Sequence, residues 1–376
     1  MFWQREYIRE AKSMTLNDTY RLDLPNHGLL GSLLLRLSGD QIAEYGADGG
    51  AWRIIDKIDE VEIVINGATI CKSLKGDMVQ AAAFYDNKII SPDSWRNYAT
   101  NTQWCYMLIN FGRFLHDTEF GLDLSQHENV ELRIKNTASS TTDFSGLAVS
   151  VLGIYLRDGG SFKGYMRTEE WRKWTTVQDE TKYLDLPTEF ILRRVLLQAI
   201  PALDANNVEK TGMNNLMDDI ELNLESGKVK VYKGGIDDLL RDNYWSYGGL
   251  IITAMNPYHN AGKGINVGIG YVMGAMAGAA SAADAVATTF PTLKHCQTGH
   301  TQEFENGRIG GAPGLVASGL GYHNSIVYRF DHDKDPASWL DPEARKTVTL
   351  NIHTRDLATY VAGGTNKVIL DRLVTY

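Results

Sequence analysis

Three side chains that could bind a metal ion lie close together in the sequence, namely His295, Cys296 and His300. Imidazole nitrogen and thiolate sulfur are ligands that zinc and other transition metals prefer in proteins. A metal site of this kind needs further ligands at a familiar spacing, and no second cluster of such residues stands nearby. We therefore expect these residues to belong to a turn or an interface, and we expect no metal and no cofactor.

Two pairs of adjacent carboxylates could in principle serve acid–base chemistry, Asp218-Asp219 and Asp237-Asp238. Glycoside hydrolysis uses two carboxylates that flank one bond. Adjacent residues of a strand point to opposite faces, so neither pair would converge on a substrate. We interpret them as turn and solvent-facing charges.

Signatures of nucleophilic, phosphate-binding and metallopeptidase sites do not occur in the sequence. There is no Gly-x-Ser-x-Gly, no Gly-Lys-Ser/Thr phosphate loop and no His-Glu-x-x-His. A two-domain cupin would need His-x-His, which is also missing, while His323, His332 and His353 are scattered. We predict no catalytic residue and a protein that is not an enzyme.

The tryptophans leave a second interpretation open, a carbohydrate-binding or carbohydrate-active protein in which exposed rings stack on sugars. The candidates are Trp95, Trp104, Trp171, Trp174, Trp245 and Trp339. Aromatic residues make up 10% of the chain, which is only a little above ordinary. Many of these rings are therefore expected in cores or interfaces.

Composition describes a folded protein of about two domains. The chain has 376 residues, 43% of them apolar and 22% charged. Its three cysteines are too few and too far apart for a disulfide framework, which suits a reducing compartment. The formal net charge of −9 argues against direct, sequence-specific nucleic-acid binding, because phosphate neutralisation needs clustered Lys and Arg.

An internal repeat organises the chain. Leu22-Asp23-Leu24-Pro25 recurs 162 residues later as Leu184-Asp185-Leu186-Pro187, with similar apolar runs after both. Further matches follow in the same order with smaller shifts: Val61-Glu62-Ile63 with Ile220-Glu221-Leu222, Lys75-Gly76 with Lys233-Gly234, and Asp86-Asn87 with Asp242-Asn243. Late in each half, Val130 to Ile134 resembles Val348 to Ile352 at a shift of 218. One unit was thus duplicated, and the second copy gained an insertion.

Each copy consists of short strands with turn residues between them. Asn66-Gly67 separates two strand-like runs and predicts a hairpin with a type I′ turn. Glu225-Ser226-Gly227 occupies the corresponding place in the second copy. We predict an all-β fold of two tandem eight-stranded antiparallel jelly-roll β-sandwiches, with short helices and an elaborated loop in the second.

Domain boundaries follow from the repeat. We expect an N-terminal arm over residues 1–17, which would be a short amphipathic docking helix, and a first jelly roll over 18–158. A polar linker with a short helix is expected over 159–180. The second jelly roll would cover 181–376, with a Gly/Ala-rich insertion at about 256–320.

The insertion contains an uncharged stretch, Ile265 to Ala283, with Gly270, Gly274 and Gly278 at four-residue spacing. This is the small-residue pattern of a transmembrane helix. The many glycines, and the strands expected on both sides, favour a surface loop or tower packed against a neighbouring subunit. The role of residues 261–290 is left open by the sequence.

The pattern resembles the double jelly-roll major capsid proteins of tailless, often membrane-containing, icosahedral viruses, the lineage that includes adenovirus hexon. The likeness rests on the paired Leu-Asp-Leu-Pro segments, on Asn66-Gly67, and on Ile109 to Arg113 leading to Gly121 to Ser125. It covers the chain from about residue 18 to Tyr376 as architecture more than as identity.

The resemblance implies a homotrimer in which six jelly rolls form a pseudo-hexagonal capsomer of an icosahedral capsid. Partners would be other copies, neighbouring capsomers, and other capsid proteins such as penton or minor proteins. The N-terminal arm would point inward, towards an internal membrane or neighbouring capsomers. The protein would be made in the host cytoplasm and located in the virion.

Overall fold

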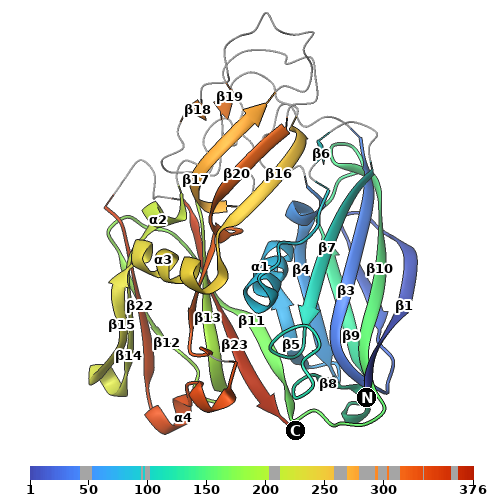
Figure 1. The fold of residues 1–376 in the computed structure, drawn as a ribbon, viewed down its shortest axis with the longest axis horizontal. Helices are drawn as coiled ribbons and strands as arrows, with labels where there is room; N and C mark the ends of the chain where they lie inside the picture. The colour runs from blue at the N-terminus through green and yellow to red at the C-terminus, as the bar shows by residue number, and fades with distance from the viewer. Residues whose placement is uncertain are drawn as a thin grey trace, which may run out of the picture.

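The computed structural model describes most of the chain. The described residues are 1–42, 53–94, 96–97, 102–202, 212–257, 269–278, 293–294, 303–304, 314–332, 334–356 and 363–376. Strands dominate, and two 12-residue helices and several short helical turns complete the fold (Figure 1).

The first half is a sandwich of two sheets. One sheet has the order β1(Phe2–Met14), β10(Phe144–Arg157), β3(Leu29–Gln41), β7(Thr102–Asn110), with β8(Leu122–Asp123) also paired to β3. The other has the order β2(Thr19–Asp23), β9(Val130–Asn136), β4(Ile58–Ile65), β5(Thr69–Leu74). Apolar residues of both sheets, such as Leu35 and Ile63, meet in one core. Apart from the consecutive pairs β4–β5 and β7–β8, successive strands alternate between the two sheets, which is jelly-roll topology.

The second half repeats this topology. One sheet has the order β11(Gly164–Thr175), β23(Thr365–Thr375), β13(Ile191–Ile200), β21(Ser325–Arg329). The other has the order β12(Thr181–Asp185), β22(Val348–Thr354), β14(Met217–Leu224), β15(Val229–Gly235). A second core lies between them, with Leu197 and Leu222 among its members. The predicted fold class of two tandem jelly rolls is confirmed.

One continuous sheet joins the two sandwiches. Strand β5, at the edge of the first sandwich, pairs in parallel with β11 of the second through Lys72 with Thr168 and Ser73 with Glu169. The two four-stranded sheets thereby become a single eight-stranded sheet. The halves are therefore connected by backbone hydrogen bonds as well as by side chains.

The predicted repeat corresponds to equivalent strands. Leu22 lies in β2 and Leu184 in β12, and β9 and β22 begin at Val130 and Val348. The predicted type I′ turn is also present, since Asn66 and Gly67 both have positive φ, at 51° and 72°.

A helix follows the fifth strand of each sandwich, α1(Gly76–Asn87) in the first and α3(Ile236–Tyr247) in the second. Their starts are 160 residues apart, so the sequence pairing of Asp86-Asn87 with Asp242-Asn243 is wrong by about one helical turn. The side chain of Asn243 binds the backbone of Val327 on β21 of its own sandwich, whereas Asp86 faces the other sandwich. The remaining helical turns are η1(Ile54–Lys57), η2(Leu124–Gln126), α2(Met213–Leu216), η3(Glu225–Gly227), η5(Pro336–Ser338) and α4(Pro342–Arg345).

Two expected segments have a different structure. Residues 2–14, expected as a helical arm, form β1, an edge strand paired with β10 from Phe2 with Arg157 to Met14 with Leu147. The expected linker helix is also wrong, because residues 164–175 form β11 between β5 and β23. Pairing with neighbouring strands decides the conformation of these polar segments.

The insertion lies between α3 and β21. Strands β17(Ile269–Gly278), β20(Gly314–Tyr322) and β16(Leu250–Pro257) form a sheet with β6(Arg96–Asn97), and β18(Leu293–Lys294) pairs with β19(Glu303–Phe304). Gly270, Gly274 and Gly278 thus belong to a strand, and the transmembrane-helix interpretation of this segment is wrong. No helix within the described ranges is long and apolar enough to cross a membrane. The rest of 261–290 lies outside these ranges.

Candidate functional site

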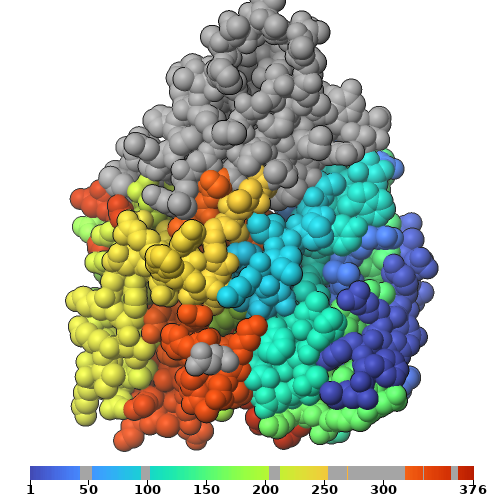
Figure 2. All heavy atoms as spheres, viewed as in Figure 1, coloured from blue at the N-terminus to red at the C-terminus, as the bar shows by residue number. Residues whose placement is uncertain are grey.

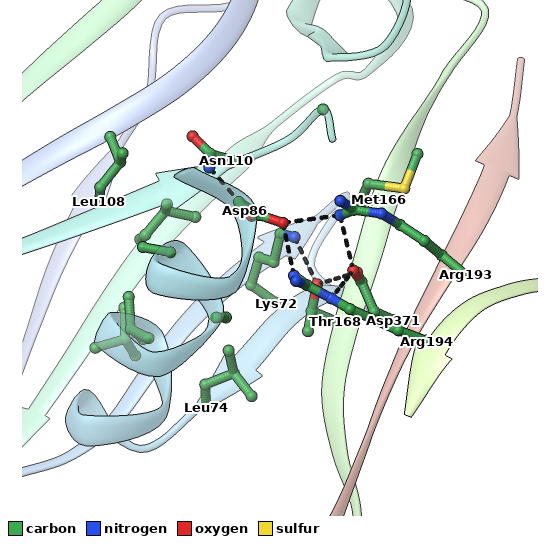
Figure 3. A pocket seen from close by; sticks show the side chains of 16 residues that line it. Lys72, Leu74, Asp86, Leu108, Asn110, Met166, Thr168, Arg193, Arg194 and Asp371 are labelled. Atoms are coloured by element: carbon green, nitrogen blue, oxygen red, sulfur yellow. Dashed lines mark hydrogen bonds and ion pairs between the residues drawn. The ribbon is translucent and has the colours of Figure 1, made fainter. Parts of the chain in front are cut away.

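The most concentrated set of ionisable side chains lies where the two sandwiches meet. We call it the junction network: Lys72 on β5, Asp86 on α1, Thr168 on β11, Arg193 and Arg194 on β13, Asp331 after β21, and Asp371 on β23. All seven residues are buried. Figure 3 shows Lys72, Asp86, Thr168, both arginines and Asp371 pointing toward one another.

Two arginines hold carboxylates from both sandwiches. The Asp86 carboxylate accepts from Arg193 Nη1 at 2.9 Å and lies 2.8 Å from Arg194 Nη2. The Asp371 carboxylate lies 3.1 Å from Arg193 Nη1 and 2.8 Å from Arg194 Nε. Arg193 also donates from Nε to Asp331 at 2.7 Å. A helix of the first sandwich is thus fastened to two strands of the second.

A short chain of hydrogen bonds extends the network to β5 and β11. Lys72 Nζ donates to Thr168 Oγ1 at 2.7 Å, and that hydroxyl donates to Asp371 Oδ1 at 2.7 Å. Lys72 and Thr168 are themselves partners in the parallel pairing of β5 and β11, and Thr168 pairs with Asp371 on its other side. The side-chain contacts therefore reinforce the backbone contact at the same place.

The network is electrically balanced, with three cations and three carboxylates. Burial alone would raise the pKa of Asp371, but the guanidinium groups of Arg194 and Arg193 offset this and lower it to about 2. Burial lowers the pKa of Lys72, and Asp371 partly opposes that effect. Because each charge has a partner, the network stabilises one arrangement of the halves.

A small cavity lies beside the network, lined by Leu74, Val79, Asn110 and Met166 together with every network residue except Asp331. Its volume of about 20 Å³ has room for one water molecule. Binding sites for small molecules are larger by an order of magnitude. This cavity is therefore too small to hold a substrate or an organic cofactor.

A wider, open groove lies between the sandwiches near the ends of β5 and β13. It is lined by Asp59, Glu60, Ser73, Leu74, Lys75, Glu170, Lys173, Ile200, Thr365 and Lys367. The lining carries three carboxylates and three lysines, and Lys367 pairs with Glu170 at 2.8 Å. The lining therefore favours neither anions nor cations.

The histidine and cysteine candidates do not converge in the described residues. His323 is buried and its Nε2 lies 2.7 Å from Gln80 Oε1, whereas His353 lies on β22 near Asp179 and Thr181. Within the residues that the structure describes, no three His, Cys, Asp or Glu side chains are placed to hold a metal ion. His295, Cys296 and His300 lie outside those residues, so the expectation for them stays a prediction.

Arg355 joins the two pairs of adjacent carboxylates. Arg355 lies 3.0 Å from Asp218 Oδ1 and 3.4 Å from Asp237 Oδ2, so one member of each pair shares this guanidinium. Asp238 pairs instead with Arg241 at the surface, at 3.4 Å. The two salt bridges of Arg355 hold the start of β14 and the start of α3 to the end of β22.

The described tryptophans lie on unrelated parts of the molecule. Trp339 is buried against Phe120, and Trp171 and Trp174 pack against the second core. Trp104 on β7 and Trp245 on α3 are exposed. Trp95 lies outside the described residues. These positions do not form one sugar-stacking platform.

Sequence reasoning missed the junction network, although a signal was present. Arg193-Arg194 interrupts the apolar run of β13, and Asp371-Arg372 interrupts that of β23. Adjacent charges within a strand that is otherwise apolar on both faces indicate buried ion pairs, because isolated charges are rarely buried.

Comparison with known proteins gives a match in structure but not in sequence. No family model matches the chain, and no curated protein matches it. It is similar to the solved structure of the STIV MCP, with a TM-score of 0.62 and 11% identity, over 100% of this chain and 97% of that chain.

Two other solved structures are similar over nearly the whole chain. One is that of PBCV-1 VP54, with a TM-score of 0.57 and 10% identity, over 99% of this chain and 94% of that chain. The other is the major capsid protein P2 from bacteriophage PM2, with a TM-score of 0.52 and 11% identity, over 99% of this chain and 98% of that chain. At these identities the comparison shows a shared fold.

Proposed function

We propose that this chain is a major capsid protein, which associates with further copies of itself as a trimer and builds the shell of an icosahedral virus. The observation that carries the proposal is the match of both jelly rolls, in tandem, to the STIV and PM2 capsid proteins over nearly the full length of each chain. A single jelly roll occurs in proteins of many functions, so the tandem arrangement is the more specific feature.

The junction network supports this role. A capsid subunit must keep its two halves in a fixed relation, because each half forms contacts that repeat throughout the shell. The eight-stranded sheet and the buried ion pairs fix that relation. These contacts hold together two halves that a flexible linker alone would allow to move independently.

Partners under this proposal are other copies in the trimer, neighbouring capsomers and minor capsid proteins, and the location is the virion. The proposal includes no catalytic step. Residues 2–14 are paired with β10 in the first sandwich, and we therefore do not assign them the role of a free arm that reaches a membrane.

Light scattering on the purified chain after size-exclusion chromatography tests the proposal. We expect a mass of three chains, and electron micrographs of concentrated protein should show pseudo-hexagonal particles or shells. A chain that stays monomeric at all concentrations, and that is retained on polysaccharide resin, would contradict the proposal and favour the carbohydrate-binding alternative.

A further inference from the structure

The two helices that follow the fifth strands occupy equivalent positions but differ in exposure. Tyr85 on α1 and Trp245 on α3 are each the tenth residue of their helix. The exposed fraction is 5% for Tyr85 and 85% for Trp245. The preceding residues, Phe84 and Tyr244, differ in the same way, at 4% and 42%. Figure 2 shows the yellow segment that contains α3 at the molecular surface.

The second sandwich covers α1. The Tyr85 hydroxyl donates to the Ser325 carbonyl of β21 at 2.8 Å, and the Phe84 ring lies 5.6 Å from that of Tyr322. At the other end of the helix, Gln198 of β13 donates through Nε2 to Asp77 at 3.2 Å. Asp77, Phe84 and Tyr85 lie on one stripe of the helix, since they are seven and eight residues apart. On α3 the same stripe carries Asp237, Arg241, Tyr244 and Trp245, three of which are exposed.

The surface that receives α1 also has an equivalent in the first sandwich. Leu196 of β13 pairs with Ile369 of β23, and both are fully buried in the core shared with the first sandwich. The equivalent pair is Leu34 of β3 with Leu152 of β10, in the same register. Both of these side chains are only half-buried.

Residues beside this pair are equivalent as well. Gln198, two residues after Leu196, pairs with Ser325 of β21, whereas Arg36, two residues after Leu34, pairs with Tyr106 of β7. Tyr7 of β1, opposite Leu152, is 51% exposed. The outer face of the sheet β1-β10-β3-β7 thus presents half-buried and exposed apolar side chains around Arg36, whose guanidinium lies 5.0 Å from the centre of the Trp104 ring. We call it the acceptor face, defined by Tyr7, Leu34, Arg36, Tyr106 and Leu152.

We infer that α3 of one copy docks on the acceptor face of a second copy of this chain, in the way that α1 docks on the second sandwich within the chain. Under this equivalence Trp245 lies against Tyr106, as Tyr85 lies against Ser325. Asp237, whose carboxylate also lies 3.4 Å from Arg355, comes opposite Arg36, as Asp77 lies opposite Gln198. The amide–carboxylate contact within the chain becomes a guanidinium–carboxylate contact between chains, so the two surfaces are complementary in charge.

The inference rests on the proposed function, because it names the contact through which the copies associate. The contact is heterologous: each copy presents one helix and receives another on a different surface. Such contacts form a closed ring when the rotation between copies closes. Within each chain, α1 already docks on the second sandwich. A closed ring of three copies would therefore contain six such contacts between a helix and a sheet face, three within chains and three between chains.

Cross-linking tests the contact directly. We would combine Trp245→Cys with Tyr106→Cys and add a short bismaleimide cross-linker. We expect dimers and closed trimers on a denaturing gel. The single variants report any background from the three native cysteines. The control pair is Trp245→Cys with Tyr183→Cys. Tyr183 is 73% exposed on β12, a strand that the proposed contact does not include, so this pair should not cross-link.

A mixing experiment tests the direction of the contact. Trp245→Ser removes the helix anchor, and Leu34→Glu places a charge on the acceptor face, so each variant alone should be monomeric by light scattering. Mixed together, they retain one intact contact, between α3 of the Leu34→Glu chain and the acceptor face of the Trp245→Ser chain. We expect a heterodimer and no trimer. Thermal unfolding and circular dichroism verify that each variant is folded, and Tyr183→Ser is the matched surface control, which should stay trimeric.

The outcomes separate this inference from the proposed function. If the unmodified chain forms trimers but Trp245→Ser also does, and the cysteine pair fails to cross-link, the contact is wrong while the capsid proposal stands. If the unmodified chain is a monomer at every concentration, the proposed function fails and the inference fails with it.

Discussion

Asp86 of the first sandwich and Asp371 on the last strand of the second are 285 residues apart, yet the same two guanidinium groups bind both carboxylates. Arg193 and Arg194 each bind one carboxylate from the first sandwich and at least one from the second. This relationship makes the junction sensitive to the loss of a single charge.

Replacement of Asp371 by Asn should destabilise the protein strongly. The substitution leaves two buried arginines with one shared carboxylate fewer, and breaking a buried ion pair costs about 3–5 kcal/mol. Urea unfolding followed by tryptophan fluorescence measures the loss. Asp238→Asn is the control, because Asp238 forms a surface pair with Arg241 that should be worth less than about 1 kcal/mol. Equal effects of the two substitutions would contradict a special role of the junction network.

Equivalent leucines should respond differently to truncation. Leu196→Ala removes a fully buried side chain, and we expect it to lower the free energy of unfolding by about 2–5 kcal/mol. Leu34→Ala, at the equivalent half-buried position, should cost the monomer less than about 1 kcal/mol but weaken association. Urea unfolding of dilute chains gives the first comparison, and the concentration dependence of light scattering gives the second. A large loss of monomer stability in Leu34→Ala would show that its own sandwich already buries that side chain.

The contribution of His323 to the free energy of unfolding should fall in mild acid. Burial and the charge of Arg53 lower the pKa of His323 to about 3, whereas an unfolded histidine titrates near 6.5. Below about pH 6.5 the unfolded chain therefore binds a proton that the folded chain does not, and the stability difference grows until the pH reaches the folded pKa. By about pH 4.5 the loss should be about 3 kcal/mol.

The variant His323→Gln isolates this effect. Nearby Asp93 works in the opposite sense, because burial raises its pKa to about 6, so the total pH dependence is a sum of both groups. The difference between the unmodified chain and His323→Gln, measured by urea unfolding at several pH values, removes the contribution of Asp93. A difference that is constant between about pH 7 and 4.5 would contradict the assignment.

Gly164 should not tolerate a side chain. Its φ is +157°, and an added Cβ would lie 2.1 Å from the Val374 carbonyl oxygen of the paired strand. Gly164→Ala must therefore separate β11 from β23 at the start of the second sandwich, at a cost of roughly 1–3 kcal/mol. Gly146→Ala is the control, since an added Cβ there meets nothing within 4 Å. Thermal unfolding of the two variants should show a lower midpoint for Gly164→Ala alone.

The tandem jelly rolls could be predicted from the sequence because local signals define their strands. The hairpin turn at Asn66-Gly67 requires positive φ at both residues, and the Leu-Asp-Leu-Pro segments end equivalent strands. These signals act over a few residues and survive duplication. The duplication was therefore visible even where identity between the copies is low.

Other features depend on partners that are distant in sequence. Strand β1 lies at a sheet edge with most side chains exposed, so its sequence lacks the alternation of a half-buried strand. Strand β11 has many polar residues, and its pairing with β5 and β23, rather than local propensity, determines its extended conformation. The junction network brings together residues from Lys72 to Asp371, and no spacing within the sequence specifies that contact.

The position of β23 has a consequence for the order in which the protein folds. Strand β23 is far from β11 and β13 in the sequence, yet it lies between them in the sheet and contributes Asp371 to the junction. Until residues Thr365–Thr375 have been synthesised, β11 and β13 lack the strand that joins them, and Arg193 and Arg194 lack Asp371. The second sandwich and its junction with the first are therefore completed in one late step, so chains that terminate before Thr365 should not assemble.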